Sequence, residues 1–243
     1  MMKYFAIESS LDEKIMGKVD QCKEYIHHCN VWEDPNFIDR FPFEKIHSKP
    51  ILSTPVLHSN AKLTDLIKTI STGFSFGSMI ISDKFKSILD DFNCFGIQYF
   101  QTYLIYKSKE VNDYWQTHIS EIPYSYIDFE NTKFFIKNSE TRRIDNDKPL
   151  EIKNLLDFNN KKDSLEYPFS ISINEVQFDK TFKYDYFFLR YFENGGNKGI
   201  VSERLKEEIE KQGCTGIEFR PIEMSLQDWY HSGERERIYG KSY

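Results

Sequence analysis

Ile81–Phe100, ISDKFKSILDDFNCFGIQYF, is the stretch that decides the fold, because its pattern returns in Val201–Arg220, VSERLKEEIEKQGCTGIEFR. The two stretches align without a gap at an offset of 120 residues, and five of the twenty aligned positions are identical. The identical pairs are Ser82/Ser202, Lys86/Lys206, Cys94/Cys214, Gly96/Gly216 and Ile97/Ile217. Chance would give about one identity, so the sequence predicts an internal duplication.

Each copy has the pattern of a capped helix followed by a strand. Ser82 and Ser202 each precede an acidic residue, a combination typical of helix N-termini. After the helix, the shared glycine, Gly96 or Gly216, turns the chain into a strand, and a short apolar run before the helix supplies another strand. The sequence therefore predicts two related β-α-β elements.

The rest of the chain is dominated by segments rich in aromatic and β-branched residues, which predict strands. The predicted strands are residues 3–7, 97–106, 114–119, 124–136, 169–178 and 184–192. The predicted helices are residues 20–28, 61–70 and 150–158, with an exposed turn at 159–163. The strand that begins at Ile217 contains Pro221, which is typical of a sheet edge. The predicted fold class is α+β, with a mixed sheet.

These patterns divide the chain into three parts. Residues 1–73 are expected to form an irregular N-terminal segment that packs on the core, residues 74–226 the core domain with both copies, and residues 227–243 a tail.

Composition and charge exclude several classes of function. The net charge is -6 and no long basic run occurs, which disfavours binding to nucleic acid. No apolar run is long enough to cross a membrane or to form a signal peptide core. The four cysteines are few for 243 residues, as is usual in a reducing compartment. We therefore expect a cytoplasmic protein without disulfides that binds neither nucleic acid nor membrane.

The search for catalytic and metal-binding motifs yields little. The nucleophile elbow, the two-histidine zinc helix, the phosphate-binding loop and the dinucleotide fingerprint are all missing from the sequence. One cluster has metal-ligating residue types: Cys22, His27, His28 and Cys29. On the predicted helix the two histidines would point away from the face that holds the cysteines, so we expect no metal site there. We also expect no cofactor.

Two groups of residues are candidates for a functional site. Tyr124, Tyr126, Asp128 and Glu130 share one face of the predicted strand 124–136, where the two carboxylates would lie about 6.5 to 7 Å apart. Such a pair suits acid–base chemistry, a solvated strand face, or a contact patch for a partner protein. In the tail, Trp229 and Tyr230 form a second candidate contact, or a cover over the edge strand.

A resemblance to a known family adds a function. The run Gly199–Phe219, GIVSERLKEEIEKQGCTGIEF, resembles the carboxy-terminal signature of a bacterial family of immunity proteins from polymorphic toxin systems, the eleventh such family and formerly a domain of unknown function. Upstream, Ile80–Lys86, the strand to Tyr106 and Tyr126–Asn131 resemble the earlier segment of the same family, in the same order. The resemblance implies a cytoplasmic protein that binds the effector domain of a cognate toxin, and it carries no catalytic residues with it.

Three hypotheses of function follow. The first is a non-enzymatic immunity protein that occludes the active site of a cognate toxin, with Tyr124, Tyr126, Asp128, Glu130, Trp229 and Tyr230 as the contact residues. The second is an enzyme that uses Asp128 and Glu130 as an acid–base pair. The third is a structural or assembly module of a secretion or phage-like particle.

Overall fold

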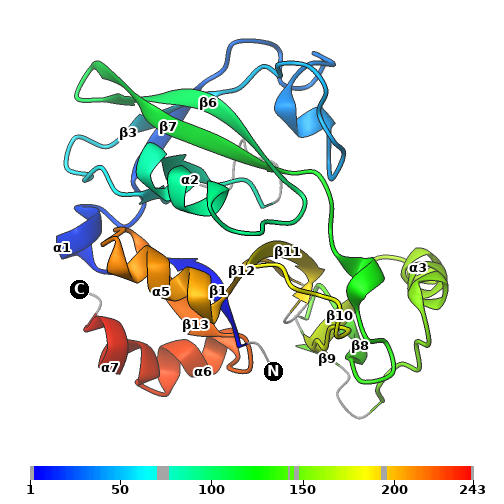
Figure 1. Ribbon diagram of the computed structural model, residues 1–243. Coiled ribbons are helices and arrows are strands. Elements are labelled where there is room, and N and C mark those ends of the chain that lie inside the picture. Colours follow the sequence, from blue (N-terminus) through cyan, green and yellow to red (C-terminus); the bar gives the residue numbers. More distant parts are fainter. Residues whose placement is uncertain (1–2, 70–76, 142, 145–147, 193–195, 242–243) are drawn as a thin grey trace.

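The computed structural model describes residues 3–69, 77–141, 143–144, 148–192 and 196–241. They form a mixed α+β structure in which strands predominate, and this confirms the predicted fold class. Figure 1 shows two large sheets, one above the other, with a third small sheet at their side. The predicted boundary between residues 73 and 74 lies outside the described residues.

The upper sheet has six strands in the order β2-β3-β6-β7-β5-β4. These strands are β2 (Cys22–Ile26), β3 (Thr54–Leu57), β4 (Leu66–Ile67), β5 (Ile80–Ser82), β6 (Ile97–Tyr106) and β7 (Lys109–Ile119). The lower sheet has four strands in the order β11-β12-β1-β13. They are β1 (Tyr4–Ser9), β11 (Tyr186–Tyr191), β12 (Gly196–Ser202) and β13 (Ile217–Pro221). As predicted, β13 is an edge strand.

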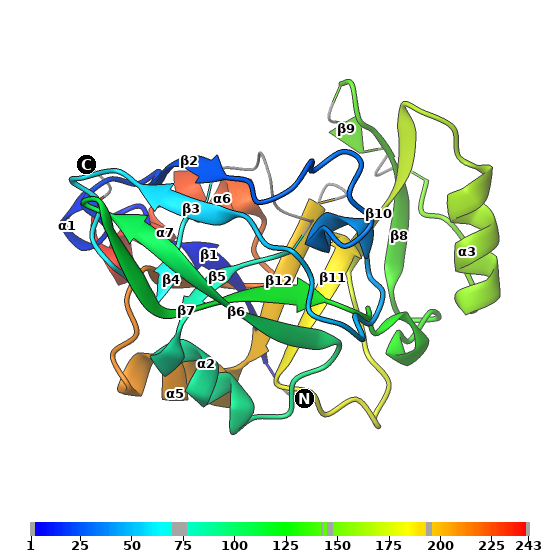
Figure 2. The same ribbon diagram turned by 90° about the horizontal axis from the view of Figure 1, so that it is seen from above.

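The third sheet has the order β10-β8-β9, with β8 (Lys133–Asn138), β9 (Arg143–Ile144) and β10 (Phe169–Glu175). It lies with helix α3 (Leu155–Ser164) at the side of the two large sheets (Figure 2). The other helices of the described chain are α1 (Glu13–Met16), η1 (Ile38–Arg40), α2 (Asp83–Asp90), η2 (Tyr124–Tyr126), α5 (Glu203–Lys211), α6 (Leu226–His231) and α7 (Glu234–Tyr239).

Both quoted stretches form the predicted capped helix and strand. The Ser82 hydroxyl accepts a hydrogen bond from the Phe85 amide at 3.2 Å, and the Ser202 hydroxyl accepts one from Leu205 at 3.3 Å. Gly216 has a φ of +83°, and a Cβ atom there would lie 2.6 Å from the Leu66 carbonyl oxygen. A side chain at this turn would therefore collide with the neighbouring backbone.

The two β-α-β elements are split by an inserted strand. β5 and β6 are each antiparallel to β7, which lies between them, so β5 and β6 are parallel to each other but not paired. β12 and β13 have the same relation to β1. We call β4, β5, α2, β6 and β7 the first unit, and β11, β12, α5, β13 and β1 the second unit. The strand order is the same in both units.

The pairing register is also the same in both units. Leu66 pairs with Ile81 in the first unit, and Tyr186 pairs with Val201 in the second unit, 120 positions later in each strand. The inserted strands β7 and β1 correspond at a different offset. Tyr114 of β7 pairs with Ser82, and Tyr4 of β1 pairs with the equivalent Ser202, so these two tyrosines match although they are 110 positions apart. β1 comes before the first unit in the chain but belongs to the sheet of the second, whereas β7 comes just after β6.

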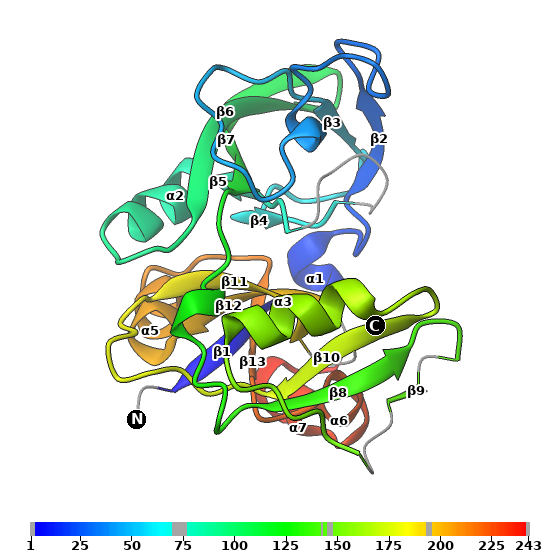
Figure 3. The ribbon, with the colours of Figure 1, turned by 90° about the vertical axis from the view of Figure 1, so that its right-hand side faces the viewer.

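Helices α2 and α5 lie next to each other at one side of the two large sheets and pack on each other (Figure 3). Phe85 and Leu89 of α2 share one apolar cluster with Leu205 and Ile209 of α5, and all four side chains are buried. The apolar positions thus face the core that both units share, while Lys206 and Glu210 form an ion pair outside it.

Two aspartates tie the units together in a reciprocal way. Asp185 of the second unit accepts hydrogen bonds from the Ser202 hydroxyl at 2.6 Å and from the Asn93 amide, after α2, at 3.1 Å. Asp65 of the first unit accepts hydrogen bonds from the Ser82 hydroxyl at 2.6 Å and from the Thr215 amide, after α5, at 2.7 Å. Each carboxylate therefore fixes the helix start of its own unit and the helix exit of the other.

Several predicted elements are wrong. Residues 20–28 contain strand β2 instead of a helix, and residues 61–69 contain the short strand β4, with Ile70 outside the described residues. Helix α3 begins at Leu155 and continues to Ser164, so the predicted turn at 159–163 lies inside it. Asn154 caps this helix by accepting a hydrogen bond from the Asp157 amide, so the helix begins five residues after the predicted start at residue 150.

We predict that Asp185→Ala lowers the free energy of unfolding by roughly 3 kcal/mol, because it leaves a buried hydroxyl, an amide and Arg204 without their shared acceptor. Asp65→Ala is the matched control. Its carboxylate is less buried, so the expected loss is roughly half as large. Urea unfolding followed by circular dichroism measures both, and equal losses would contradict this ranking.

Candidate interaction site

A cavity of about 680 Å³ opens where the segment after β10 meets the lower sheet. It is lined by residues 174–180 and Phe182, and by Ile222 and Glu223, which follow β13. Tyr4 of β1 and Phe192 complete the lining. Its residues come from the beginning, the middle and the end of the chain, and it is within the size range of ligand-binding pockets.

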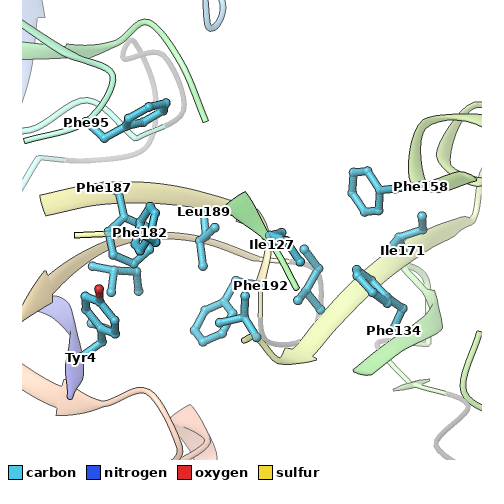
Figure 4. Close-up of a cluster of buried hydrophobic side chains, with 14 of the residues drawn as sticks. Tyr4, Phe95, Ile127, Phe134, Phe158, Ile171, Phe182, Phe187, Leu189 and Phe192 are labelled. Atoms are coloured by element: carbon cyan, nitrogen blue, oxygen red, sulfur yellow. The ribbon is translucent and has the colours of Figure 1, made fainter. Parts of the chain in front are cut away.

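Aromatic rings form the floor of the cavity. The rings of Phe178 and Phe182 stack with their centroids 4.1 Å apart and their planes within 12°. Phe187 meets both rings edge-on and Tyr4 meets Phe178 edge-on. Figure 4 shows Tyr4, Phe182 and Phe187 gathered in one cluster. Burial raises the pKa of the Tyr4 hydroxyl to about 12, so this hydroxyl is uncharged at neutral pH.

The rim of the cavity is acidic. Glu175, Asp179 and Glu223 line it together with a single lysine, Lys180. The Thr181 hydroxyl and amide donate hydrogen bonds to Asp179, and they hold the pKa of this carboxyl below its ordinary value. The cavity thus combines an apolar aromatic floor with a surplus of negative charge.

Tyr124 and Tyr126 do not lie on a strand, which corrects the prediction for residues 124–136. They form the short helix η2, and only the end of the predicted range belongs to β8. Tyr124 packs on Phe158 with ring centroids 5.0 Å apart. Tyr126 packs edge-on against Phe95, and its ring lies 5.5 Å from that of Phe182 beneath the cavity. Both tyrosines are half-buried and contribute to the core.

Asp128 and Glu130 follow in a turn, so the expected carboxylate pair on one strand face does not form. The Asp128 carboxylate accepts hydrogen bonds from the amide and the side chain of Asn131 at 3.2 and 2.8 Å. Its own amide donates to Gln177 at 2.9 Å. Asp128 therefore stabilises the turn behind the cavity wall, and Glu130 is exposed.

Trp229 and Tyr230 differ in exposure although both belong to α6. Trp229 is fully buried, whereas Tyr230 is 39 % exposed. Trp229 packs edge-on against Tyr239 of α7, and the Tyr239 hydroxyl accepts a hydrogen bond from the Phe219 amide of edge strand β13 at 2.8 Å. The tail therefore covers the edge strand, which was the alternative interpretation of these residues.

A layer of paired charges lies between the lower sheet and the tail. Glu8 binds Lys198 at 2.7 Å and Arg220 at 3.2 Å. Glu218 binds Arg235 of α7 at 2.6 Å, and Arg220 and Arg235 are both buried. These carboxylates are neutralised by partners within the fold, so we assign them a structural role.

The corresponding positions of the upper sheet carry neutral or apolar residues instead. His118 matches Glu8, Gln98 matches Glu218 and Phe100 matches Arg220. Burial lowers the pKa of His118, whose Nε2 atom lies 2.8 Å from the carbonyl oxygen of Glu44. The neutral imidazole is therefore the form that the folded chain favours.

The candidate metal ligands do not converge. Cys22 is buried in β2 and its thiol contacts its own strand, at the Glu24 carbonyl. His27 and His28 lie within hydrogen-bond distance of the hydroxyls of Ser53 and Thr54. The described residues contain no group of His, Cys, Asp and Glu side chains that could hold a metal ion. Burial raises the pKa of Cys94 to about 12 and that of Cys214 to about 11, which keeps both thiols protonated.

Sequence reasoning missed the cavity because its residues are far apart in the chain. The stretch from Gln177 to Phe182 has a detectable pattern, aromatic residues beside charged ones, but it follows a predicted strand and was assigned to it in part. Nothing local to Tyr4 or Glu223 indicates that they meet this stretch.

No family model matches the chain, and a comparison with curated proteins found no significant match. Within the described part of the chain, the helices are all too short or too polar to cross a membrane.

We predict that Trp229→Ala lowers the free energy of unfolding by about 3 to 5 kcal/mol, because it empties a fully buried site under α6. Tyr230→Ala is the matched control on the same helix, and its effect is expected to stay below about 1 kcal/mol because the side chain is partly exposed. Thermal unfolding measures both. Equal stability of the two variants would show that Trp229 is not a core residue.

We predict that stability falls on acidification through His118. The pKa of His118 is lowered in the folded chain, so the unfolded chain binds more protons below the ordinary value of 6.5. As the pH falls from 6.5 to the folded-state pKa of His118, the free energy of unfolding should decrease by at most about 1.4 kcal/mol per pH unit. His118→Gln should remove this slope in urea titrations at pH 5 to 7. The exposed His47→Gln is the control and should keep it.

Proposed function

We propose that this chain is a non-catalytic immunity protein that binds the effector domain of a cognate toxin and covers its active site. The cavity beside Phe178 and Glu223 is the observation that carries the proposal, because it is a preformed concave surface with an aromatic floor and a charged rim. Such surfaces provide anchoring sites in protein interfaces. The resemblance of Gly199–Phe219 to an immunity family supports the same function.

Occlusion requires a rigid surface, and the architecture supplies one. The cavity wall from Gln177 to Asp179 is held from behind by backbone hydrogen bonds, with the Asp128 amide bound to Gln177 and the Asp179 amide bound to Tyr126, both at 2.9 Å. The ring cluster fixes the side chains of Phe178 and Phe182. A site that is already ordered loses less conformational entropy on binding, which favours a tight complex.

The predicted contact residues enter this proposal in revised roles. Asp128 and Tyr126 support the cavity wall, and Trp229 holds the tail on the lower sheet. Tyr230 and Glu130 are exposed and remain candidates for direct contact with the toxin. Cytoplasmic location belongs to the same proposal, because the resemblance to the immunity family implies a cytoplasmic protein.

We also infer that the two units arose by duplication of one ancestral unit. The equal strand order, the equal register and the matched Asp65/Ser82 and Asp185/Ser202 contacts support this origin. The different offset of β1 and β7 suggests that the copies exchanged their first strands. An experimental structure in which β1 pairs with β5 and β6 would contradict the exchange.

We predict that co-expression of this chain restores the growth of cells that produce the toxin encoded beside it, because the toxin active site is covered in the complex. The complex should co-purify with equal amounts of both chains, also when the toxin carries an inactivating substitution. Growth curves and size-exclusion chromatography measure the two results. Unrelieved toxicity without a complex would contradict the proposed function.

The matched control for this experiment is Leu156→Lys. Leu156 is the strongly exposed leucine of α3, on the part of the molecule that carries the third sheet, and its side chain is 68 % exposed. Growth rescue by this variant should equal that by the unchanged chain.

A further inference from the structure

The cavity beside Phe178 and Glu223 has a chemistry that selects its occupant. Three of its lining side chains are carboxylates and one is an ammonium group. Of these, Glu175 already pairs with Lys133 at 2.9 Å, outside the lining. Within the described part of the chain, no hydrogen bond or ion pair engages the Glu223 carboxylate, which is exposed. A carboxylate therefore faces the cavity with its charge available.

The floor favours a cation as well. Phe178 and Phe182 present stacked rings, and Tyr4 adds a third ring at 6.1 to 6.2 Å from them. Aromatic faces attract cations, most often the guanidinium group of arginine, which is flat and weakly hydrated. Val176 and Ile222 extend the apolar lining, where the methylene stem of a long side chain can pack.

Other occupants fit less well. A phosphate or a nucleic acid strand would meet the surplus of carboxylates and be repelled, in line with the net charge of -6. A purely apolar side chain would take water away from the rim carboxylates without replacing their hydrogen bonds. A lysine would match the charge, but its compact ammonium group binds water more strongly and lacks the planar face that stacks on a ring.

We propose that this cavity is the receptor for one arginine side chain with an apolar neighbour, presented by a basic segment of the toxin. The arginine specificity follows from the cavity itself. That the arginine belongs to a toxin rests on the proposed function. The guanidinium group packs on the ring of Phe178, which is partly exposed, and donates hydrogen bonds to Glu223. Its apolar neighbour contacts Val176 and Ile222.

The first experiment uses the full chain and two peptides, without any toxin. The probes are acetyl-Leu-Arg-Leu-amide and acetyl-Leu-citrulline-Leu-amide, which have nearly the same shape but differ in charge. Aromatic resonances of Phe178 and Phe182 are followed by NMR during titration. The arginine peptide should shift them in a saturable way and bind at least about tenfold more tightly than the citrulline peptide, a difference of about 1.4 kcal/mol. Equal shifts from both peptides, or no shift, would overturn the proposal.

Two variants locate the binding. Glu223→Gln should weaken binding of the arginine peptide about threefold to tenfold and reduce its salt dependence, because the charge-assisted hydrogen bonds are lost. Glu207→Gln is the control, since Glu207 is an exposed glutamate on α5, far from the lining residues. Thermal unfolding checks that both variants are as stable as the unchanged chain. An unchanged affinity of Glu223→Gln would overturn the assignment.

The complex with the toxin separates the two proposals. Glu223→Lys should weaken co-purification with the inactivated toxin at least tenfold, while Glu207→Lys should not. If the Glu223→Lys variant still rescues growth and binds the inactivated toxin as tightly as the unchanged chain, the arginine receptor is overturned and the immunity function is not. Selective binding of the arginine peptide without any toxin rescue would overturn the immunity function and leave the receptor intact.

Discussion

The structure depends on one carboxylate in each unit, Asp65 or Asp185, which stands directly before an outer strand of its sheet. A charge placed there can bind a hydroxyl at the start of one helix and an amide after the other helix at the same time. Both bonds are made to an ionised group in a poorly solvated place, where such hydrogen bonds are strong. The start of each helix is therefore fixed within its own unit and its exit by the other unit, which brings α2 and α5 into one apolar cluster.

The two units differ in what covers the sheet face that points away from helices α2 and α5. In the lower sheet this face carries Glu8, Glu218 and Arg220, and the helical tail supplies Arg235 as a further partner. In the upper sheet the segment around Ile46 covers the same face, where backbone groups of Ile46 pair with the amide of Gln98 at 2.8 and 2.9 Å. Charged residues thus occur where a cationic partner is provided, and neutral polar residues occur where only the backbone is available. Both solutions pair buried polar groups of the sheet, through ion pairs in the lower sheet and through backbone groups in the upper sheet.

The predictable parts of the structure are those with local signals. Ser82 and Ser202 mark helix starts because a hydroxyl can cap the first amides, and Gly216 marks a turn that excludes a side chain. Residues 20–28 were predicted as a helix, yet pairing with β3 makes Cys22–Ile26 a strand. The cavity and the strand exchange could not be predicted, since both depend on contacts between residues more than 150 positions apart. Local propensity carries no information about such contacts.

The place of β1 in the lower sheet has a consequence for synthesis on the ribosome. β1 is made before the other described strands, yet its neighbours β12 and β13 lie about 200 residues later in the chain. The lower sheet cannot close until nearly the whole described chain has emerged, and until then Tyr4 and Ala6 lack their partners. The upper sheet receives β7 directly after β6, so it can form during translation. The first unit can therefore form before the second, and β1 must wait for β12 and β13 before it has both of its neighbours.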